Sequence, residues 1–539
     1  MPALPAVVLG LVAACNAEGC LSLAPLFSGG FGGGGSGGGG AAGRLAALAA
    51  SLPGRLAAVA ASLPGWPRRG PPLYTHAAMA AALGWFALVL ALHLLLPGTY
   101  AQGAPLPDGS GRTLRYKLNA SSCFVVLYGS ALALSAGGLG GASFDLGWAA
   151  DNFLPLATAS VLLSTALSVA VYAASFLPPG EGGTEALNGG SAGATAAASA
   201  AGGGATAVAA KTNAAGANHD GPPPPRRQQR RLLSAHGATG VPWYDFWMGR
   251  ELNPRVRLSF PPAWVSRCSL FPAPFRRWAA RTSAKISADL DLKEFCELYP
   301  GMMGWALLNL SFACAQARDH PGAGFLGTGV SNAMLLVNAF ELWYVADALL
   351  NEGAILTTMD VTTDGLGFML SFGDLAWVPF TFATQARFLA ESAGPPDGAQ
   401  ALSGAAALGV LAVQLGGYAI FRGANGQKNA FRRDPSAPAV ARLRSMPTAR
   451  GTRLLVSGWW GLARHVNYLG DWIMGLAWCL PTGIPGLRAA VPYFYAAYFA
   501  LLLAHRERRD DAACAAKYGA ADWGRYCALV PWRIVPWVY

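Results

Sequence analysis

Long runs of apolar residues without any charge dominate this 539-residue chain. His76–Pro97 contains no Asp, Glu, Lys or Arg, and Ser121–Phe144 and Asn152–Gly180 are equally uncharged. Each run reaches the roughly 20 apolar residues that a helix needs to cross a bilayer. Because backbone groups in lipid must be satisfied internally and no alternating barrel pattern occurs, we predict an all-α integral membrane protein. Further candidate spans are Leu298–Ala317, Pro321–Phe340, Leu366–Arg387, Gly398–Phe421, Leu454–Leu487 and Ala489–Ala504.

From these runs we predict about nine or ten transmembrane helices. The composition supports this prediction. Hydrophobic residues make up 53% of the chain and charged residues 12%, whereas about 25% of an ordinary globular chain is charged. These values exclude a soluble enzyme, a nucleic-acid-binding module and a disordered scaffold as the main body. The net charge of +11 therefore indicates basic cytosolic loops beside anionic membrane lipid, with no nucleic-acid partner.

The distribution of lysine and arginine predicts the orientation of the chain. The stretch 422–453 is densely basic, and Arg506–Arg509 follows the last apolar run, whereas the short loop 391–397 has no lysine or arginine. Basic residues concentrate in cytosolic loops. We therefore expect 422–453 and the C-terminal tail to be cytosolic.

The ends of the apolar runs suggest a division into five parts. Residues 1–72 form a low-complexity segment with a glycine tract and a tandem repeat, GRLAALAASLP then GRLAAVAASLP, and with Glu18 as its only acid. An acid-poor segment of this kind is either a targeting peptide or a low-complexity extension without a target. The Ala/Gly/Pro-rich insert 181–240 is predicted to be disordered. The first transmembrane helices then occupy 73–180, the central membrane core 241–421 and the C-terminal part 422–539.

Common metal and nucleotide motifs are absent from the sequence. The nine cysteines include no CxxC pair, so no metal site and no disulfide framework is predicted. The GxGxxG-like strings in 31–40 are polyglycine, and no strand and helix flank them. Walker and HExxH patterns do not occur, and the GxSxG strings at 34–38 and 189–193 lie in glycine-rich low-complexity stretches. A nucleotide would therefore bind in a helical pocket of another kind.

Ionisable residues in apolar sequence are costly, so each one is a functional hypothesis. In ELWYVADALLNEGAILTTMDVTTDG (341–365), Tyr344 and Asp347 lie three residues apart and would share a helix face. A buried carboxyl group there could serve as a general acid. The alternative is that Asp360 and Asp364 only cap or terminate helices at the interface.

Three basic or aromatic clusters follow in the C-terminal part. Lys428 and Arg432, four residues apart, could grip a phosphate together, or they are ordinary cytosolic loop charges. In LLVSGWWGLARHVNYLGDW (454–472), aromatic, amide and charged side chains are of the kinds that bind a nucleotide. A spacing of four residues would place Arg506, Asp510, Cys514 and Tyr518 on one face of a helix.

Several long strings resemble the sterol reductases of the endoplasmic reticulum. They include FWMGRELNPR (246–255), DLKEFCELYPGMMGW (291–305) and LLVSGWWGLARHVNYLGDW (454–472), which cover 241–539 densely and extend loosely to 73–177. RGANGQKNAFRR (422–433) and the ending RIVPWVY are most similar to the Δ14-reductases and to the reductase-like part of the lamin B receptor. The resemblance implies about ten transmembrane helices, NADPH as the cofactor, and reduction of the 14,15 double bond of a Δ8,14-sterol.

The same resemblance implies a set of NADPH-binding residues, although KYGAADWGRY has one residue more than the family spacing before Tyr526. A sterol alkene accepts hydride only after it is protonated, so an acid must protonate carbon 15 before carbon 14 accepts the hydride. Tyr344, with Asp347 or Asp360 behind it, is our candidate for the proton path. The implied cofactor residues are Lys428, Arg432, Leu455, Trp460, Asn467, Tyr468, Asp471, Arg506, Asp510, Cys514, Tyr518 and Tyr526.

Three other functions remain as alternatives. The first is a Δ7-sterol reductase, although those enzymes differ where Gly423 stands. The second is an isoprenylcysteine-type membrane methyltransferase, which shares a string resembling Arg464–Gly470 but whose cofactor has no phosphate for Lys428 and Arg432. The third is a lamin-receptor-like structural protein of the nuclear envelope, for which 1–72 is too short and too poor in lysine. We expect a multi-pass protein of the endoplasmic reticulum membrane, which is continuous with the nuclear envelope.

Overall fold

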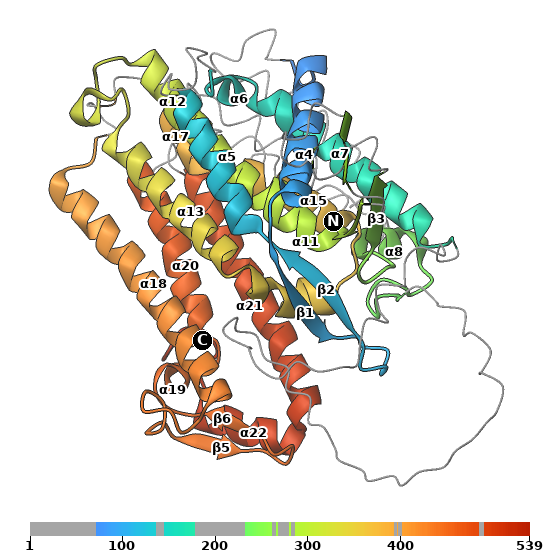
Figure 1. Cartoon of the computed structure of the whole chain (residues 1–539). Coiled ribbons are helices and arrows are strands. Elements are labelled where there is room, and N and C mark those ends of the chain that lie inside the picture. The colour runs from blue at the N-terminus through green and yellow to red at the C-terminus, as the bar shows by residue number, and fades with distance from the viewer. Residues whose placement is uncertain are drawn as a thin grey trace, which may run out of the picture.

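The computed structural model of the chain is mostly helical (Figure 1). The longest helices are α4 (His76–Leu95), α7 (Phe153–Ala174), α13 (Asn332–Leu350), α18 (Gly404–Arg433) and α21 (Ala490–Tyr518). The described residues are 72–135, 145–177, 232–260, 266–267, 277, 280–281, 286–392, 396, 401–483 and 490–539. The predicted low-complexity segment, apart from residue 72, and residues 181–231 of the predicted insert therefore lie outside the described residues.

Shorter elements connect these helices. The strands form three two-stranded antiparallel sheets, β1–β2, β3–β4 and β5–β6. The strands are β1 (Thr99–Pro105), β2 (Thr113–Leu118), β3 (Arg255–Phe260), β4 (Ile286–Asp291), β5 (Ser445–Pro447) and β6 (Arg453–Leu455). The shorter helices are α5 (Ala120–Ser135), α6 (Trp148–Asp151), α8 (Pro242–Met248), α11 (Leu292–Cys296), α12 (Gly304–Asp319), α14 (Met359–Thr362), α15 (Phe368–Phe372), α16 (Val378–Phe382), α17 (Thr384–Glu391), α19 (Trp459–Leu462), α20 (Val466–Cys479) and α22 (Ala520–Leu529).

Helices α4, α7, α13 and α18 are long and apolar enough to cross a membrane, which confirms the membrane-protein prediction in its main point. Leucines on the outside of α4 and α18 are largely exposed, as expected for side chains that face lipid. The prediction of a helical fold is confirmed in its main part, and three short two-stranded sheets are added to it. Their sequences are short and polar, so apolar periodicity gave no sign of them.

The predicted span Pro321–Phe340 begins too early. Four glycines between residues 322 and 329 have positive φ, a backbone conformation that ends regular helix. Helix α13 begins only after Ser331, whose hydroxyl oxygen accepts a hydrogen bond from the N–H of Met334 at 3.1 Å. It then continues to Leu350. As a result, Tyr344 and Asp347 both lie within α13.

The predicted spans Leu298–Ala317 and Leu366–Arg387 each contain a stretch of π-helix. The segment η2 (Glu297–Met303) leads into α12, and η5 (Gly373–Trp377) separates α15 from α16. A Cβ atom on Gly301 of η2 would lie 2.8 Å from the backbone oxygen of Asp374, so the two π segments pack closely. Short π-helical insertions are common at functional sites.

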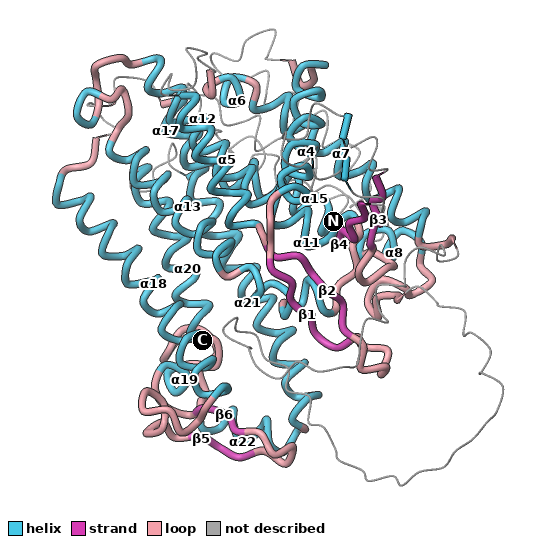
Figure 2. Tube along the Cα trace, in the orientation of Figure 1, coloured by secondary structure: helices cyan, strands magenta, loops and turns pink. Residues whose placement is uncertain are grey.

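The C-terminal helices α18, α20 and α21 lie together, and α19, α22 and the β5–β6 strands gather at one end of them (Figure 1). Loops are abundant at this end (Figure 2). The predicted span Leu454–Leu487 is not one continuous helix. Its long helical part consists of α20 (Val466–Cys479), which the short 3₁₀ turn Leu480–Thr482 extends.

Glycines allow α18 and α20 to approach each other closely. A Cβ atom on Gly417 would lie 2.9 Å from the backbone oxygen of Gly470, and one on Gly470 would lie 2.6 Å from the backbone nitrogen of Phe421. Small residues at helix crossings are a recognised way for membrane helices to pack. This contact sets the distance between Lys428 on α18 and Tyr468 on α20.

We expect Gly417→Ala to destabilise the protein and Gly416→Ala to leave it unchanged or slightly more stable. The added methyl group of Gly417→Ala meets backbone atoms that cannot rotate away, whereas nothing lies within 4 Å of a Cβ atom on Gly416. Replacing glycine with alanine in an open helix position gains roughly 1 kcal/mol. The melting temperatures of the two variants in detergent micelles measure the difference. Equal melting temperatures would show that the helix crossing is not tight.

Candidate functional site

Tyr344 of α13 and Asp471 of α20 meet in the interior of the helical bundle. The Tyr344 hydroxyl group lies within hydrogen-bonding reach of the Asp471 carboxylate. The rings of Trp478 and Trp305 enclose the tyrosine ring, with centroids 5.1 and 6.0 Å away. Oδ1 of Asp471 is buried without a hydrogen-bond partner among the described residues. A phenol held by a carboxylate in apolar surroundings is a candidate proton donor.

Arg506 of α21 connects this pair with other carboxylates. Its guanidinium group forms an ion pair with Asp360 of α14. It also interacts electrostatically with Asp471, Tyr344 and Glu297. Because a guanidinium group does not lose its proton in proteins, Arg506 supplies a permanent positive charge among these acids. We call Tyr344, Asp471, Arg506 and Asp360 the acid cluster.

Asp347 does not occupy the position that the sequence suggested for it. Its carboxylate forms an ion pair with Arg422 and accepts a hydrogen bond from the hydroxyl group of Tyr418 at 3.1 Å, and both partners are on α18. The direct partner of Tyr344 is therefore Asp471, not Asp347. Residue spacing along one helix could not identify this partner, because α20 lies far away in the sequence and packs against α13.

Lys428 and Arg432 lie on one face at the end of α18. The Lys428 ammonium group stands 4.4 Å from the ring centroid of Trp460, and the Trp460 indole N–H donates to the backbone oxygen of Ala424 at 2.8 Å. Arg432 is exposed and has no ion pair among the described residues. Its charge acts on Lys428, on which the nearby Asp510 acts with the opposite sign. The exposed guanidinium group of Arg432 is therefore the positive charge that is available to a ligand.

Two further basic residues extend this positive site, and sequence analysis missed both of them. Lys517 of α21 interacts electrostatically with Arg432 and Arg450. The guanidinium group of Arg450 donates a hydrogen bond to the backbone oxygen of Lys517 at 2.8 Å. Lys517 directly precedes Tyr518 in the sequence, and this adjacency could have indicated it. We call Lys428, Arg432, Arg450 and Lys517 the basic cluster.

The first turn of α20 lies between the two clusters and presents polar atoms without protein partners. Nε2 of His465 and Oδ1 of Asn467 are buried and have no hydrogen-bond partner among the described residues. The Tyr468 hydroxyl group donates to Asp510 of α21, and the Tyr468 ring stacks on His465 with centroids 5.1 Å apart. Unpaired buried polar atoms are uncommon in native proteins and call for a ligand or water.

The remaining predicted cofactor residues lie around this turn. Leu455 is buried with Trp460 in one small hydrophobic cluster. Cys514 lies on α21 within electrostatic range of Asp510 and Lys428. Helix α21 contains all four residues that the spacing placed on one face, Arg506, Asp510, Cys514 and Tyr518.

The rings of α22 close this region from the far side. Tyr518 stacks on Trp523 with centroids 6.1 Å apart, and Trp523 contacts Tyr526 at 5.1 Å. Tyr526 is buried in that cluster, and burial raises the pKa of its hydroxyl group. Because Trp523 lies between the two tyrosines, Tyr526 supports the site from behind Tyr518.

Asp522 fastens the loop that carries Arg450. The backbone N–H of Ala449 donates to the Asp522 carboxylate at 2.6 Å, and Arg525 forms an ion pair with it. The Ala449 hydrogen bond, followed by the Arg525 contact, holds the pKa of this carboxyl group below its ordinary value. The loop is therefore anchored in the state in which Asp522 is charged.

The C-terminal tail holds the entrance to α20 in place. The backbone N–H groups of Arg464 and His465 donate to the backbone oxygens of Trp532 and Arg533 at 2.9 and 2.8 Å. Arg533 in turn forms an ion pair with the fully buried Glu507 of α21 at 3.0 Å. In the sequence, the RIVPWVY ending was notable only for its resemblance to a known family. In the structure, the tail positions the first turn of α20.

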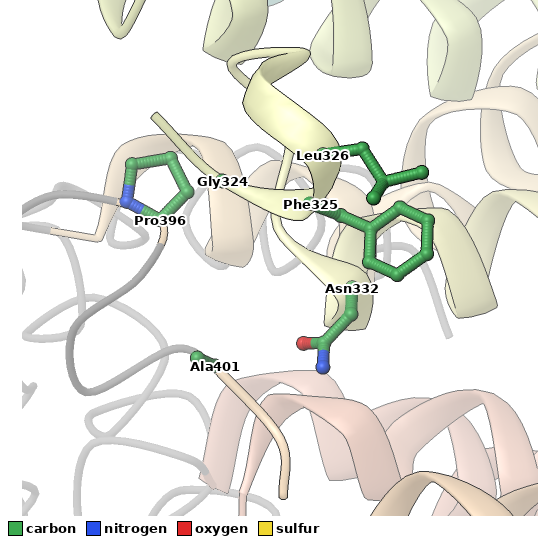
Figure 3. Close-up of a pocket in the computed structure, with 6 residues that line it drawn as sticks. All are labelled: Gly324, Phe325, Leu326, Asn332, Pro396 and Ala401. Atoms are coloured by element: carbon green, nitrogen blue, oxygen red, sulfur yellow. The ribbon is translucent and has the colours of Figure 1, made fainter. Parts of the chain in front are cut away.

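A separate pocket of about 270 Å³ lies among the loops that precede α13 and α18 (Figure 3). It contains no titratable side chain, so it has no group that could donate a proton. Among the described residues, no group of three or more His, Cys, Asp or Glu residues could hold a metal ion. The pocket is lined by Gly324, Phe325, Leu326, Asn332, Pro396 and Ala401.

Comparison with known proteins identifies a family and several relatives. The model of the ergosterol biosynthesis ERG4/ERG24 family matches residues 70–196 and 277–539. A delta(14)-sterol reductase of Ascobolus immersus is 41% identical over 467 residues, which cover 86% of this chain and 85% of the relative. Delta(14)-sterol reductases of Schizosaccharomyces pombe and Mus musculus are 37% and 39% identical, each over 87% of this chain and over 86% and 87% of the relative.

Proposed function

This chain belongs to the ergosterol biosynthesis ERG4/ERG24 family, and on that premise we propose that it reduces the 14,15 double bond of Δ8,14-sterols with NADPH as hydride donor. The observation that carries the proposal is the acid cluster, in which Tyr344 and Asp471 lie beside the permanent charge of Arg506. The acid cluster supplies a proton donor and the basic cluster a region that can bind a nucleotide. Helix α21 contributes a residue to each of them, Arg506 and Lys517. Ionic reduction of a sterol double bond needs both a proton and a hydride.

The roles of the protein residues follow from the chemistry of the alkene. The Tyr344 hydroxyl group donates a proton to carbon 15, and the positive charge that forms at carbon 14 is allylic to the 8,9 double bond. Bound NADPH supplies the hydride that carbon 14 accepts. Asp471 orients the tyrosine before the transfer, and its negative charge stabilises the developing positive charge; the tyrosinate left by the transfer regains a proton before the next turnover. The surrounding Trp305 and Trp478 exclude water, which would otherwise trap the cation.

Asp360 has a different role from the one that sequence analysis gave it. Its ion pair with Arg506 holds the guanidinium group beside Asp471. We therefore assign Asp360 as a positioning residue and retain Tyr344, now with Asp471, as the proton donor. Asp347 fastens α13 to α18 through Arg422.

The basic cluster suits the phosphate groups of NADPH. Lys428 and Arg432 would bind the phosphate that distinguishes NADPH from NADH, and Lys517 and Arg450 add positive charge at the same end. The unpaired His465 and Asn467 atoms offer hydrogen bonds to the rest of the dinucleotide. We further propose about ten transmembrane helices, location in the endoplasmic reticulum membrane, and cytosolic exposure of the basic cluster, because NADPH must reach it from the cytosol.

Purified protein in detergent micelles should convert a Δ8,14-sterol with NADPH to the Δ8-sterol, as measured by mass spectrometry of the extracted sterols. The Δ7-reductase alternative is tested in parallel with a Δ5,7-sterol. Faster conversion of the Δ5,7-sterol would overturn the assignment of the 14,15 double bond.

Replacing Arg432 with alanine should lower kcat/KM for NADPH by about one to two orders of magnitude, because a charge-assisted contact contributes roughly 1.5–3 kcal/mol and 1.4 kcal/mol corresponds to a factor of ten. The rate with NADH should barely change, since NADH lacks that phosphate. The matched control is Arg433→Ala, which removes a neighbouring exposed charge from another face of α18. An equal loss with NADPH and NADH would mean that Arg432 is an ordinary loop charge.

Tyr344→Phe should lower kcat by roughly 10²–10⁴-fold, the usual contribution of a general acid, and leave NADPH binding intact. Asp471→Asn should show a loss of the same kind, because the tyrosine loses its charged partner. Asp347→Asn provides the comparison, since that carboxylate binds Arg422 and Tyr418. Single-turnover rates and NADPH fluorescence titrations separate chemistry from binding. A larger loss of kcat in Asp347→Asn than in Asp471→Asn would return the role to Asp347.

A further inference from the structure

Two carboxylates in the membrane core remain outside the acid cluster and have no assigned role. Glu297 begins the π segment η2, and Asp374 lies in the π segment η5. The two carboxylates interact electrostatically with each other, and their segments pack directly together through Gly301. Both side chains are partly accessible although protein surrounds them. Open space therefore lies beside this carboxyl pair.

The positive charges nearest to the carboxyl pair are committed to other groups. The Lys293 ammonium group donates to the backbone oxygens of Val361 and Asp364 at 3.1 and 2.6 Å. The Arg506 guanidinium group forms its ion pair with Asp360. Among the described residues, neither member of the carboxyl pair has an ion-pair partner within 4.0 Å. An unpaired carboxylate in apolar surroundings is costly, and a ligand with a hydrogen-bond donor would reduce that cost.

A neighbouring hydroxyl group provides independent evidence for a ligand. Ser371 lies three residues before Asp374 and so shares its side of the helix. Its side chain is completely buried, and its Oγ has no hydrogen-bond partner among the described residues. Buried serine hydroxyl groups normally find a partner. A carboxylate pair and an unpaired hydroxyl group on the same side form a compact polar spot within an apolar wall.

The carboxyl pair and the proton donor flank Arg506. Arg506 interacts electrostatically with Glu297 and also with Tyr344 and Asp471. A Δ8,14-sterol is a rigid apolar plate whose one polar group is the 3β-hydroxyl on ring A. The 14,15 bond lies in ring D, at the other end of the four rings. A sterol with ring D at Tyr344 therefore needs a hydrogen-bond acceptor some distance away, in the same interior.

We propose that Glu297 and Asp374, together with Ser371, bind the 3β-hydroxyl group of the sterol and thereby hold ring D against Tyr344 and Asp471. This inference rests on the proposed function, since it takes the sterol as the substrate. The hydroxyl group donates a hydrogen bond to a carboxylate oxygen, and Ser371 completes the polar contact.

The test compares a Δ8,14-sterol that has a free 3β-hydroxyl group with its 3-methyl ether. The wild-type protein should bind the ether about 10- to 100-fold more weakly, the factor expected for a hydrogen bond to a charged acceptor. Glu297→Met removes the acceptor at similar length and should reduce this discrimination to about threefold or less. Glu297→Gln, which keeps an uncharged acceptor, should give an intermediate value. Ser371→Ala is a milder variant that leaves both charges in place.

Equilibrium binding of both sterols is measured alongside turnover, so the proposed binding of the 3β-hydroxyl group is tested even if the 14,15 bond is not reduced. If the protein does not reduce the sterol but still binds it more tightly than the ether, the proposed function is contradicted and the hydroxyl-binding site is supported. The matched control is Glu341→Gln, which changes another buried carboxylate, one that accepts hydrogen bonds from Trp305 and Asn309. It should affect both sterols in the same proportion.

Two outcomes would overturn the proposal. In the first, wild-type protein binds the ether and the free sterol equally. In the second, Glu297→Met lowers kcat for both sterols by the same factor with KM unchanged, which would indicate a role in proton supply or helix packing. A shift in the pH profile of kcat with intact discrimination would support the second outcome.

Discussion

The guanidinium group of Arg506 is the contact on which the arrangement of the interior depends. It is a permanent positive charge within a predominantly apolar bundle, and its direct ion-pair partner is Asp360, which lies on a different element. The Arg506 side chain is only partly buried, with 31% of it exposed, and a partly buried charge in apolar surroundings is stabilised by acids near it. Tyr344, Asp471 and Glu297 are therefore drawn toward the same place, and the helices that carry them are held in register. Loss of this charge would leave several acids in apolar surroundings with no nearby compensation.

The contact between α18 and α20 extends this organisation from the proton donor to the nucleotide region. Because Gly417 and Gly470 let the two backbones meet, α20 can carry Asp471 toward α13 while its first turn stays beside Lys428. One short helix thus contributes to the acid cluster and also borders the basic cluster. The C-terminal tail secures the beginning of that helix through Arg464 and His465. The distance between the acid cluster and the basic cluster is therefore set by backbone packing, which is stiffer than side-chain contact.

Apolar run length predicted the membrane character of the chain and the approximate position of most helices, because bilayer thickness fixes the length of a span. It failed where backbone chemistry intervened, as at the positive-φ glycines before α13 and in the π segments η2 and η5. Residue type identified Tyr344, Asp471 and Lys428, since each is unusual in apolar sequence. The interaction partners of these side chains could not be predicted from residue type. Asp347 shares a helix face with Tyr344 by spacing, yet α18 supplies its partners and α20 supplies the partner of Tyr344.

The π segments explain why the interior can hold so many acids without bringing them into one contact. A π-helix has more residues in each turn than an α-helix, so it rotates the side chains that follow it relative to those before it. In η2 the rotation separates Glu297 from the later residues of α12, where Trp305 and Asn309 bind Glu341. In η5 it places Asp374 toward η2 and leaves Trp377 against Tyr498. Two π segments packed together thus place two carboxylates near each other, within electrostatic reach of Arg506.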